Sequence, residues 1–149
     1  MNYGVYSSVQ GPDGNGLLLP SDPALGGHSG TAATANNTPS LASGGFVPED
    51  LQTTVVSAII QARVGAVGAA PTASWSARIK GTFTRSGNTV TQVGPGVSAE
   101  VETSPALASL SAAWGVDTSV TPNHVVPVVK GATATQISWK WSASAPTSL

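Results

Sequence analysis

An alternating stretch in the middle of the chain constrains the fold more than any other feature. In ASWSARIKGTF, residues 73–83, small or apolar side chains occupy every second position from Trp75 to Phe83, and polar or charged side chains lie between them. Because successive side chains on a strand point to opposite faces of a sheet, this pattern predicts a strand with one buried face and one solvated face. Sheets built from such strands are typically antiparallel.

Further strands are predicted after this one. A short turn over residues 86–88 leads into a strand over residues 89–93, which gives a hairpin. Strand patterns also cover residues 97–103, 125–129 and 136–142. The connections between these strands are too short for the crossovers of a parallel sheet. We therefore expect a mainly β protein with an antiparallel β-sandwich over residues 72–149.

Two prolines and one small-residue segment modify this expectation. Pro122 and Pro127 cannot donate a backbone hydrogen bond, which confines the strand over residues 125–129 to a sheet edge or a bulge. The segment ALASLSAAW begins after Ser104 and Pro105 and ends at a glycine, a pattern that favours either a short helix or a loop turn.

Residues 47–71 are predicted to form a helix and a linker. Pro48 suits the first helical position, and the two carboxylates that follow complement the positive end of the helix dipole. An apolar stripe at helical spacing contains Leu51, Val55 and Ile59. Gly65, Gly68 and Pro71 then end the element. The expected fold therefore includes one N-terminal helix, whose stripe is a candidate surface for contact between subunits.

Residues 1–46 are rich in turn-forming sequence and cannot form a core of their own. Two interpretations are open: a flexible leader, or an extended N-terminal arm that becomes ordered against neighbouring proteins. The candidate anchors of such an attachment arm are Tyr3, Tyr6, Leu17, Leu18 and Leu19.

Composition excludes several classes of protein. Charged residues make up 9% of the chain, the formal net charge is -1 and the basic residues are scattered, so nucleic-acid binding is not expected. No apolar run is long enough to cross a membrane, and the first residues lack the pattern of a secretory signal. With few aromatics and no cysteine, the core is thin, which favours self-association.

The stretch QISWKW near the C-terminus raises a separate question. Ile137, Trp139 and Trp141 lie at alternate positions and share one face of a strand. Buried against the strand that carries Trp75 and Phe83, they would form a core or a subunit interface. The alternative is a platform on which sugar rings stack, with Trp141 the more exposed candidate.

No residue pattern predicts catalysis, a metal site or a cofactor. His28 and His124 have no further ligand at metal-binding spacing, and GPDGNG lacks the later ligands of a calcium loop. GHSG around Ser29 does not complete a nucleophile elbow. Glu100 and Glu102 share a strand face, so they cannot flank a glycosidic bond from opposite sides. We expect a protein that is not an enzyme.

The order of features in the second half resembles a known family. ASWSARIKGTF, RSGNTVTQVG, AAWGVD and VVPVVKGATATQISWKW follow one another over about residues 72–145, half of the chain. This series is similar to a small β-sandwich module of tailed-bacteriophage virion proteins, which is found in tail fibres, tailspikes and particle-surface proteins.

The resemblance implies a homotrimer and a place in the virion, assembled in the cytoplasm of the bacterial host. It brings no catalytic residues. The expected function is that of a decoration, cement or short-fibre protein that attaches to other phage capsid or tail proteins through its arm. The alternative is a tail-fibre adhesin that binds a host surface glycan.

Overall fold

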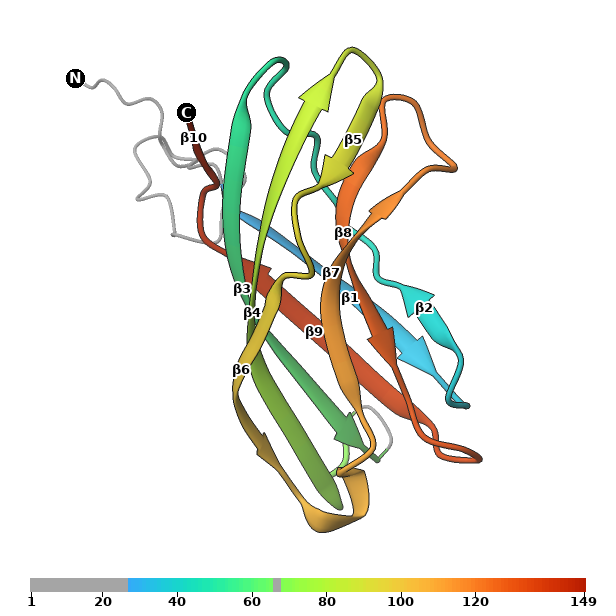
Figure 1. The fold of residues 1–149 in the computed structure, drawn as a ribbon. Coiled ribbons are helices and arrows are strands. Elements are labelled where there is room, and N and C mark those ends of the chain that lie inside the picture. The colour runs from blue at the N-terminus through green and yellow to red at the C-terminus, as the bar shows by residue number, and fades with distance from the viewer. Residues whose placement is uncertain (1–26, 66–67) are drawn as a thin grey trace, which may run out of the picture.

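The computed structural model describes residues 27–65 and 68–149, which form strands in two antiparallel sheets that pack face to face (Figure 1). The larger sheet has the order β1-β9-β3-β4-β5, with β10 also paired to β3 and β6 also paired to β4. Its strands are β1 (His28–Thr34), β3 (Thr53–Val64), β4 (Ala73–Ser86), β5 (Thr89–Gln92), β6 (Val97–Thr103), β9 (Ile137–Ala143) and β10 (Thr147–Ser148). The mainly β, antiparallel architecture expected from the sequence is confirmed.

The smaller sheet has the order β2-β8-β7. Its strands are β2 (Pro39–Leu41), β7 (Ser111–Asp117) and β8 (His124–Lys130). A short 3-10 helix, η2 (Pro105–Leu107), precedes β7 and buries Leu107 against the core. The predicted strands over residues 73–83, 89–93, 97–103, 125–129 and 136–142 all correspond to observed strands.

The helix predicted for residues 48–64 is wrong. This segment contains β3, which pairs with β4 along its whole length and with β9 over residues 58–64. Positions four residues apart share a face in a strand as well as in a helix, so the stripe of Leu51, Val55 and Ile59 could not separate the two structures. The run of β-branched residues at the start of β3 favours the strand.

The arm predicted for residues 1–46 is also incorrect in its second half. Within it, β1 pairs with β9 and β2 pairs with β8, so the β-sandwich begins near residue 28 and not at residue 72. The small side chains of β1 hide its alternation from the sequence. Gly30 lies opposite Trp141 and Ala32 opposite Trp139, so small residues leave space for the two indole rings.

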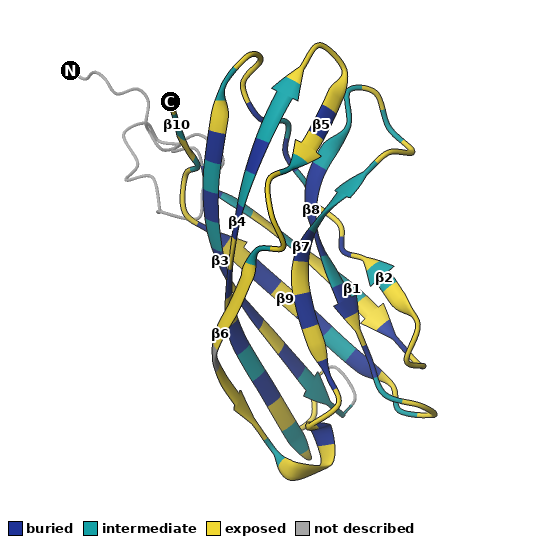
Figure 2. Ribbon diagram, viewed as in Figure 1, coloured by how far each residue is buried: buried dark blue, intermediate teal, exposed yellow. Residues whose placement is uncertain are grey.

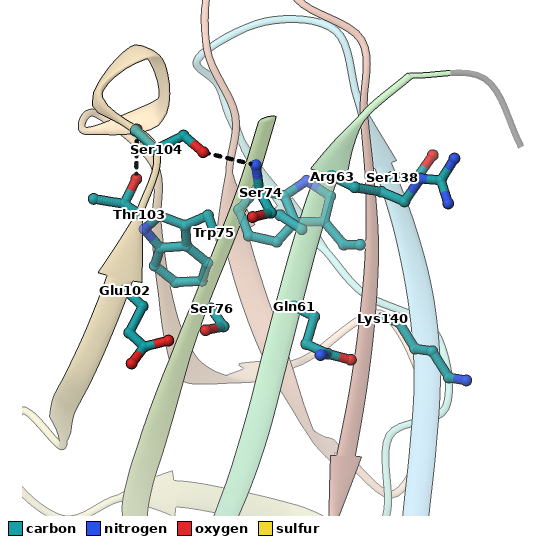
Figure 3. A pocket seen from close by; sticks show the side chains of 12 residues that line it. Gln61, Arg63, Ser74, Trp75, Ser76, Glu102, Thr103, Ser104, Ser138 and Lys140 are labelled. Carbon is teal, nitrogen blue, oxygen red and sulfur yellow. Dashed lines mark hydrogen bonds between the residues drawn. The ribbon is translucent and has the colours of Figure 1, made fainter. Parts of the chain in front are cut away.

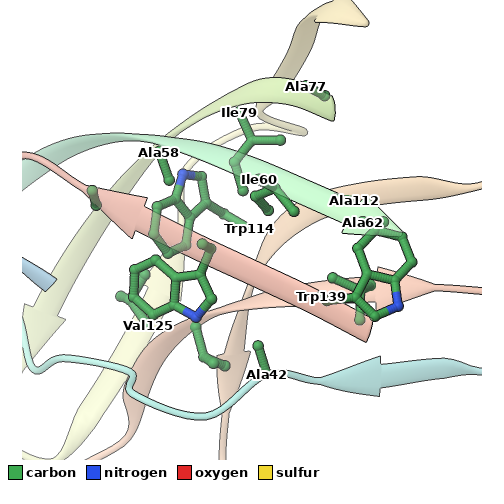
Figure 4. Close-up of a cluster of buried hydrophobic side chains, with 14 of the residues drawn as sticks. Ala42, Ala58, Ile60, Ala62, Ala77, Ile79, Ala112, Trp114, Val125 and Trp139 are labelled. Carbon is green, nitrogen blue, oxygen red and sulfur yellow. The ribbon is translucent and has the colours of Figure 1, made fainter. Parts of the chain in front are cut away.

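The core lies between the two sheets, and the alternation of buried and exposed residues along β3, β4 and β9 is visible in Figure 2. Buried members include all five aromatic or aliphatic residues predicted as core in the second half: Trp75, Phe83, Ile137, Trp139 and Trp141. Trp114 from β7 packs edge-on against Trp141 at a ring-centroid distance of 5.7 Å, which joins the sheets. Figure 4 shows Trp114 and Trp139 among the buried side chains of this core.

The C-terminal tryptophans are therefore buried in the core, as one of the two interpretations of QISWKW expected. The alternative interpretation, in which Trp141 was the more exposed candidate for sugar stacking, is wrong. Trp141 is 2% exposed and donates from Nε1 to the Ser43 carbonyl oxygen at 2.9 Å. Trp139 is 3% exposed and donates to the Thr34 hydroxyl, also at 2.9 Å. Neither ring offers a face on which a sugar could stack.

The position of Pro127 differs from the prediction, because β8 is the central strand of the smaller sheet. β2 pairs with β8 only over residues 128–130, and the next contact on that side is the bridge between Phe46 and Val125. Between them, Ala42 donates to the Pro127 carbonyl oxygen. The missing N–H of Pro127 therefore falls where the neighbouring chain is not a regular strand.

Residues just after β2 close one side of the sandwich. Ser43 donates from its backbone N–H to the Thr31 carbonyl oxygen at 2.8 Å, and its hydroxyl oxygen accepts from the Thr31 N–H at 3.0 Å. Thr31 is in β1, whereas Phe46 a few residues later pairs with Val125 of β8. This segment thus links the edge of the larger sheet to the smaller sheet.

Leu51 gives the first testable prediction. Its φ is 61°, a left-handed conformation that costs a branched side chain about 1–2 kcal/mol, and its side chain is 80% exposed. We expect Leu51→Gly to raise the free energy of unfolding by up to about 1 kcal/mol, because relief of strain exceeds the added chain entropy of glycine. Urea unfolding measures the free energy of unfolding of this variant and of the control Leu41→Gly, which changes an exposed leucine in a regular strand. The strain argument would be contradicted if Leu51→Gly does not stabilise the protein, or if Leu41→Gly stabilises it as well.

Candidate functional site

A polar groove of about 590 Å³ crosses one end of the outer face of the larger sheet. The strands β9, β3, β4 and β6 lie side by side there and present the side chains that point away from the core. Groove residues that contribute polar side chains include Gln61, Arg63, Ser74, Ser76, Glu102, Ser104, Ser138 and Lys140. Alternation places these residues outside because Ala62, Trp75 and Trp139, between them in sequence, point into the core.

Strand register arranges four of these side chains in one row. Glu102 lies opposite Ser76, Ser76 opposite Gln61, and Gln61 opposite Lys140. Figure 3 shows this order across the strands from Glu102 to Lys140. With neighbouring strands about 4.8 Å apart, the row is about 14 Å long and has a carboxylate at one end and an ammonium group at the other.

A second row borders the first, toward the end of the sheet. Ser74 lies opposite Arg63, which lies opposite Ser138. The Arg63 guanidinium donates from Nη2 to the Ala69 carbonyl oxygen at 2.7 Å, and the Ser104 hydroxyl accepts from the Ser74 N–H at 3.1 Å. These bonds hold the rim of the groove, so its shape depends on the loop after β3 and on the end of β6.

The groove presents hydroxyl, amide, carboxylate and cationic groups that can form hydrogen bonds. Across residues 27–65 and 68–149, no three His, Cys, Asp or Glu side chains gather where they could hold a metal ion. In the same ranges, no helix is long and apolar enough to cross a membrane.

The histidines singled out in the sequence lie elsewhere. His28 stacks on Phe46 at a centroid distance of 4.7 Å, and burial lowers the pKa of its imidazole. His124 lies opposite Asp117 across β7 and β8. Hydrogen bonds from the hydroxyl and backbone N–H of Ser119 hold the pKa of Asp117 below its ordinary value, with a smaller contribution from His124.

The other predicted residues separate into three groups. Ser29 is exposed on β1 opposite Ser142, so GHSG is part of a strand. Leu51 and Ile59 are exposed, at 80% and 46%, and Val55 is half-buried on the outer face of β3. The arm anchors Tyr3, Tyr6, Leu17, Leu18 and Leu19, and GPDGNG, lie outside the described residues, as does the side chain of Glu100.

Sequence reasoning missed Gln61, Ser76 and Lys140 as members of one site. Alternation correctly placed Ser76 and Lys140 on solvated strand faces, but the assignment of β3 as a helix removed the strand that joins them. The odd-numbered residues from Thr53 to Gln61 are exposed or half-buried, but Val55 and Ile59 among them are apolar, so the sequence does not show the polar outer face that would have identified Gln61.

Comparison with known proteins identifies no family for this chain. No protein-family model and no curated protein matches the sequence. Among solved structures, the tailspike protein of Acinetobacter phage vB_ApiP_P1 matches with a TM-score of 0.38 and 13% sequence identity. The match covers 99% of this chain and 26% of the tailspike chain, so this chain spans about a quarter of the tailspike's length. At this level of similarity the match establishes neither a family nor a function.

Proposed function

We propose that this chain is a structural protein of a tailed-bacteriophage virion. One observation carries the proposal: the four segments that resemble the phage module all belong to the same β domain. They contain β4, the β4–β5 turn and β5, then β7, then β8 and β9. The large aromatic residues in these segments, Trp75, Phe83, Trp114, Trp139 and Trp141, are all buried in one core. The aromatic residues on which the resemblance depends therefore all help to form the core of one domain.

Within the virion, we propose a decoration, cement or short-fibre protein without enzymatic activity. The folded domain begins near residue 28, so the attachment arm is shortened from residues 1–46 to residues 1–26. The same resemblance supports a homotrimer. Leu51 and Ile59 are exposed apolar residues, and we propose that they contact a neighbouring subunit.

Substitution of the three arm leucines tests this proposal in the full-length chain. We expect Leu17→Ser, Leu18→Ser and Leu19→Ser together to reduce the copies bound per particle at least about tenfold, because burial of three leucine side chains contributes several kcal/mol. Copy number on virions that lack the endogenous protein is measured by quantitative mass spectrometry.

The matched control replaces three residues of the folded domain's surface, Ala33→Ser, Ala99→Ser and Ala113→Ser, all exposed. The control should bind particles at full occupancy, and circular dichroism should show the same β content for both variants. Full occupancy by the triple-serine arm variant would contradict attachment through residues 1–26. Failure of the unsubstituted chain to bind any particle would contradict the virion role itself.

A further inference from the structure

β6 is held on one side only. It pairs with β4 along one edge, and no strand among residues 27–65 and 68–149 pairs with its other edge. Residues 97–99 and 101–103 are all exposed, as the colouring of β6 in Figure 2 shows. A strand with one partner and two uncovered faces buries little apolar surface. The backbone N–H and carbonyl groups along its free edge can bond to a further strand.

Apolar side chains lie on both faces of β6. Val97 lies opposite Lys80, on the outer face of the larger sheet, and is 61% exposed. Val101 precedes Glu102, which lies opposite Ser76 on the outer face, so Val101 points to the inner side, where it is 49% exposed. A strand added to this edge can therefore bury apolar surface on both sides of the sheet, through a cross-strand pair with each valine.

The charge of β6 disfavours a second copy of the same strand as its partner. β6 contains Glu100 and Glu102 but no lysine or arginine. Antiparallel pairing of two β6 strands would bring four acidic residues together, which is unfavourable between neighbouring strands. A β-bulge between the pairs at Ser76 and Arg78 also interrupts the register of β6. The strand that fits this edge has no carboxylates and forms its contact over a short length.

The first residues of the chain have the pattern of such a strand. In NYGVYSSVQ, residues 2–10, Tyr3, Val5 and Val9 lie at alternate positions, and Tyr6 belongs to the other face. The segment thus has apolar side chains for both sides of the sheet, and it is followed by the turn-forming sequence GPDGNG. Residues 1–12 contain no charged side chain, so nothing in this segment repels the glutamates of β6.

The tether between this segment and β1 has a suitable length. Partners in register cross the larger sheet from β1 to β6 in one row: His28, Ala143, Ala58, Ile79 and Ser98. With strands about 4.8 Å apart, a strand added beyond β6 lies about 24 Å from His28. Residues 11–27, which include five glycines, span about 23 Å on average as a flexible chain and about 60 Å when fully extended. A tethered segment has its highest effective concentration when these lengths match.

We propose that residues 2–10 add to the free edge of β6 as an antiparallel strand of the same chain. Four antiparallel pairings separate β1 from β6, so these two strands run in the same direction. Antiparallel addition therefore places residue 10 near the start of β6, at the row that leads back to His28. Residues 11–27 then form a loop that is fixed at both ends. This folding of the arm goes beyond the virion role and does not depend on it.

Amide hydrogen exchange of the full-length chain, followed by NMR, tests the proposal. We expect Val5→Pro, which removes a backbone donor and disrupts a strand, to speed exchange within residues 97–103 at least about tenfold. Ala24→Pro, beside Pro23 in the tether, is the matched control and should leave these rates unchanged. Unchanged exchange in β3 and β9 shows that the domain stays folded. The proposal is overturned if Val5→Pro leaves the rates in β6 unchanged, or if Ala24→Pro raises them equally.

A mixing experiment distinguishes the same chain from a second copy. Isotope-labelled Val5→Pro protein is refolded from urea together with an excess of the unlabelled, unsubstituted chain, and slow exchange in β6 should not return. Its return would assign residues 2–10 to the β6 strand of a neighbouring copy and contradict the proposal.

A spin label gives a second, independent measurement. The chain has no cysteine, so Ser8→Cys can carry a single label. The label should broaden the amide signals of residues 97–103 more strongly than those of β2, which belongs to the smaller sheet. Equal broadening of β6 and β2 would contradict the contact. None of these measurements involves virions, so their outcome is separate from that of the attachment experiment.

Discussion

Replacement of Trp141 by alanine is expected to lower the free energy of unfolding by about 4 kcal/mol, a large part of the 5–15 kcal/mol typical of a domain. The indole is 2% exposed and packs edge-on against Trp114 between the two sheets. Its removal leaves a cavity at the junction of the sheets and an unsatisfied carbonyl oxygen at Ser43. Urea unfolding followed by far-UV circular dichroism, at one fixed protein concentration, measures the loss.

Two further substitutions separate the contributions at this site. Trp141→Phe keeps an aromatic ring but loses the hydrogen bond to Ser43, so we expect a smaller cost of about 1–3 kcal/mol. Leu51→Ala removes an apolar side chain that is 80% exposed and should cost less than about 0.5 kcal/mol. A cost for Trp141→Ala as small as that for Leu51→Ala would mean that Trp141 is not part of the core.

The second large effect is expected at Gly30. A Cβ atom at this position would overlap the Ser43 carbonyl oxygen and approach Trp141 Nε1 at 2.6 Å. Both atoms are held by the hydrogen bond between them, so neither can move without cost. We expect Gly30→Ala to destabilise the protein by about 3 kcal/mol, at the upper end of the range for overpacking, as measured by the same urea titration.

Gly87→Ala is the matched control for Gly30→Ala. Gly87 has a φ of 62° in the turn between β4 and β5, and nothing lies within 4 Å of a Cβ built there. Its substitution should therefore cost only the conformational strain of about 1 kcal/mol. If Gly30→Ala costs no more than Gly87→Ala, the close approach of residue 43 to β1 is not a feature of the protein in solution.

The sequence predicts strands well where large apolar and charged residues alternate. In β4, Trp75, Ile79 and Phe83 alternate with Arg78 and Lys80, so the inner and outer faces differ strongly in polarity. In β1 the inner residues are glycine, alanine and threonine, and in the second half of β3 they are alanines on either side of Ile60, so most of them are small side chains that lie opposite residues of β9. Their inward orientation becomes evident only once β9 is paired with them.

The groove was not predictable for a related reason. Its main row combines residues 61, 76, 102 and 140, which are far apart in the sequence and are brought together by three separate strand pairings. None of these residues has a distinctive local motif.

The contact of Ser43 with Thr31 has a consequence for how molecules of this protein can aggregate. An exposed edge strand is a template onto which another chain can add by backbone hydrogen bonding. On β1, Thr31 has both its N–H and its carbonyl oxygen occupied by Ser43, and Gly44 lies against the Ser29 carbonyl oxygen. Endless sheet extension through β1 is therefore blocked, and copies of the chain that meet in solution must associate through other edges or through side-chain contacts.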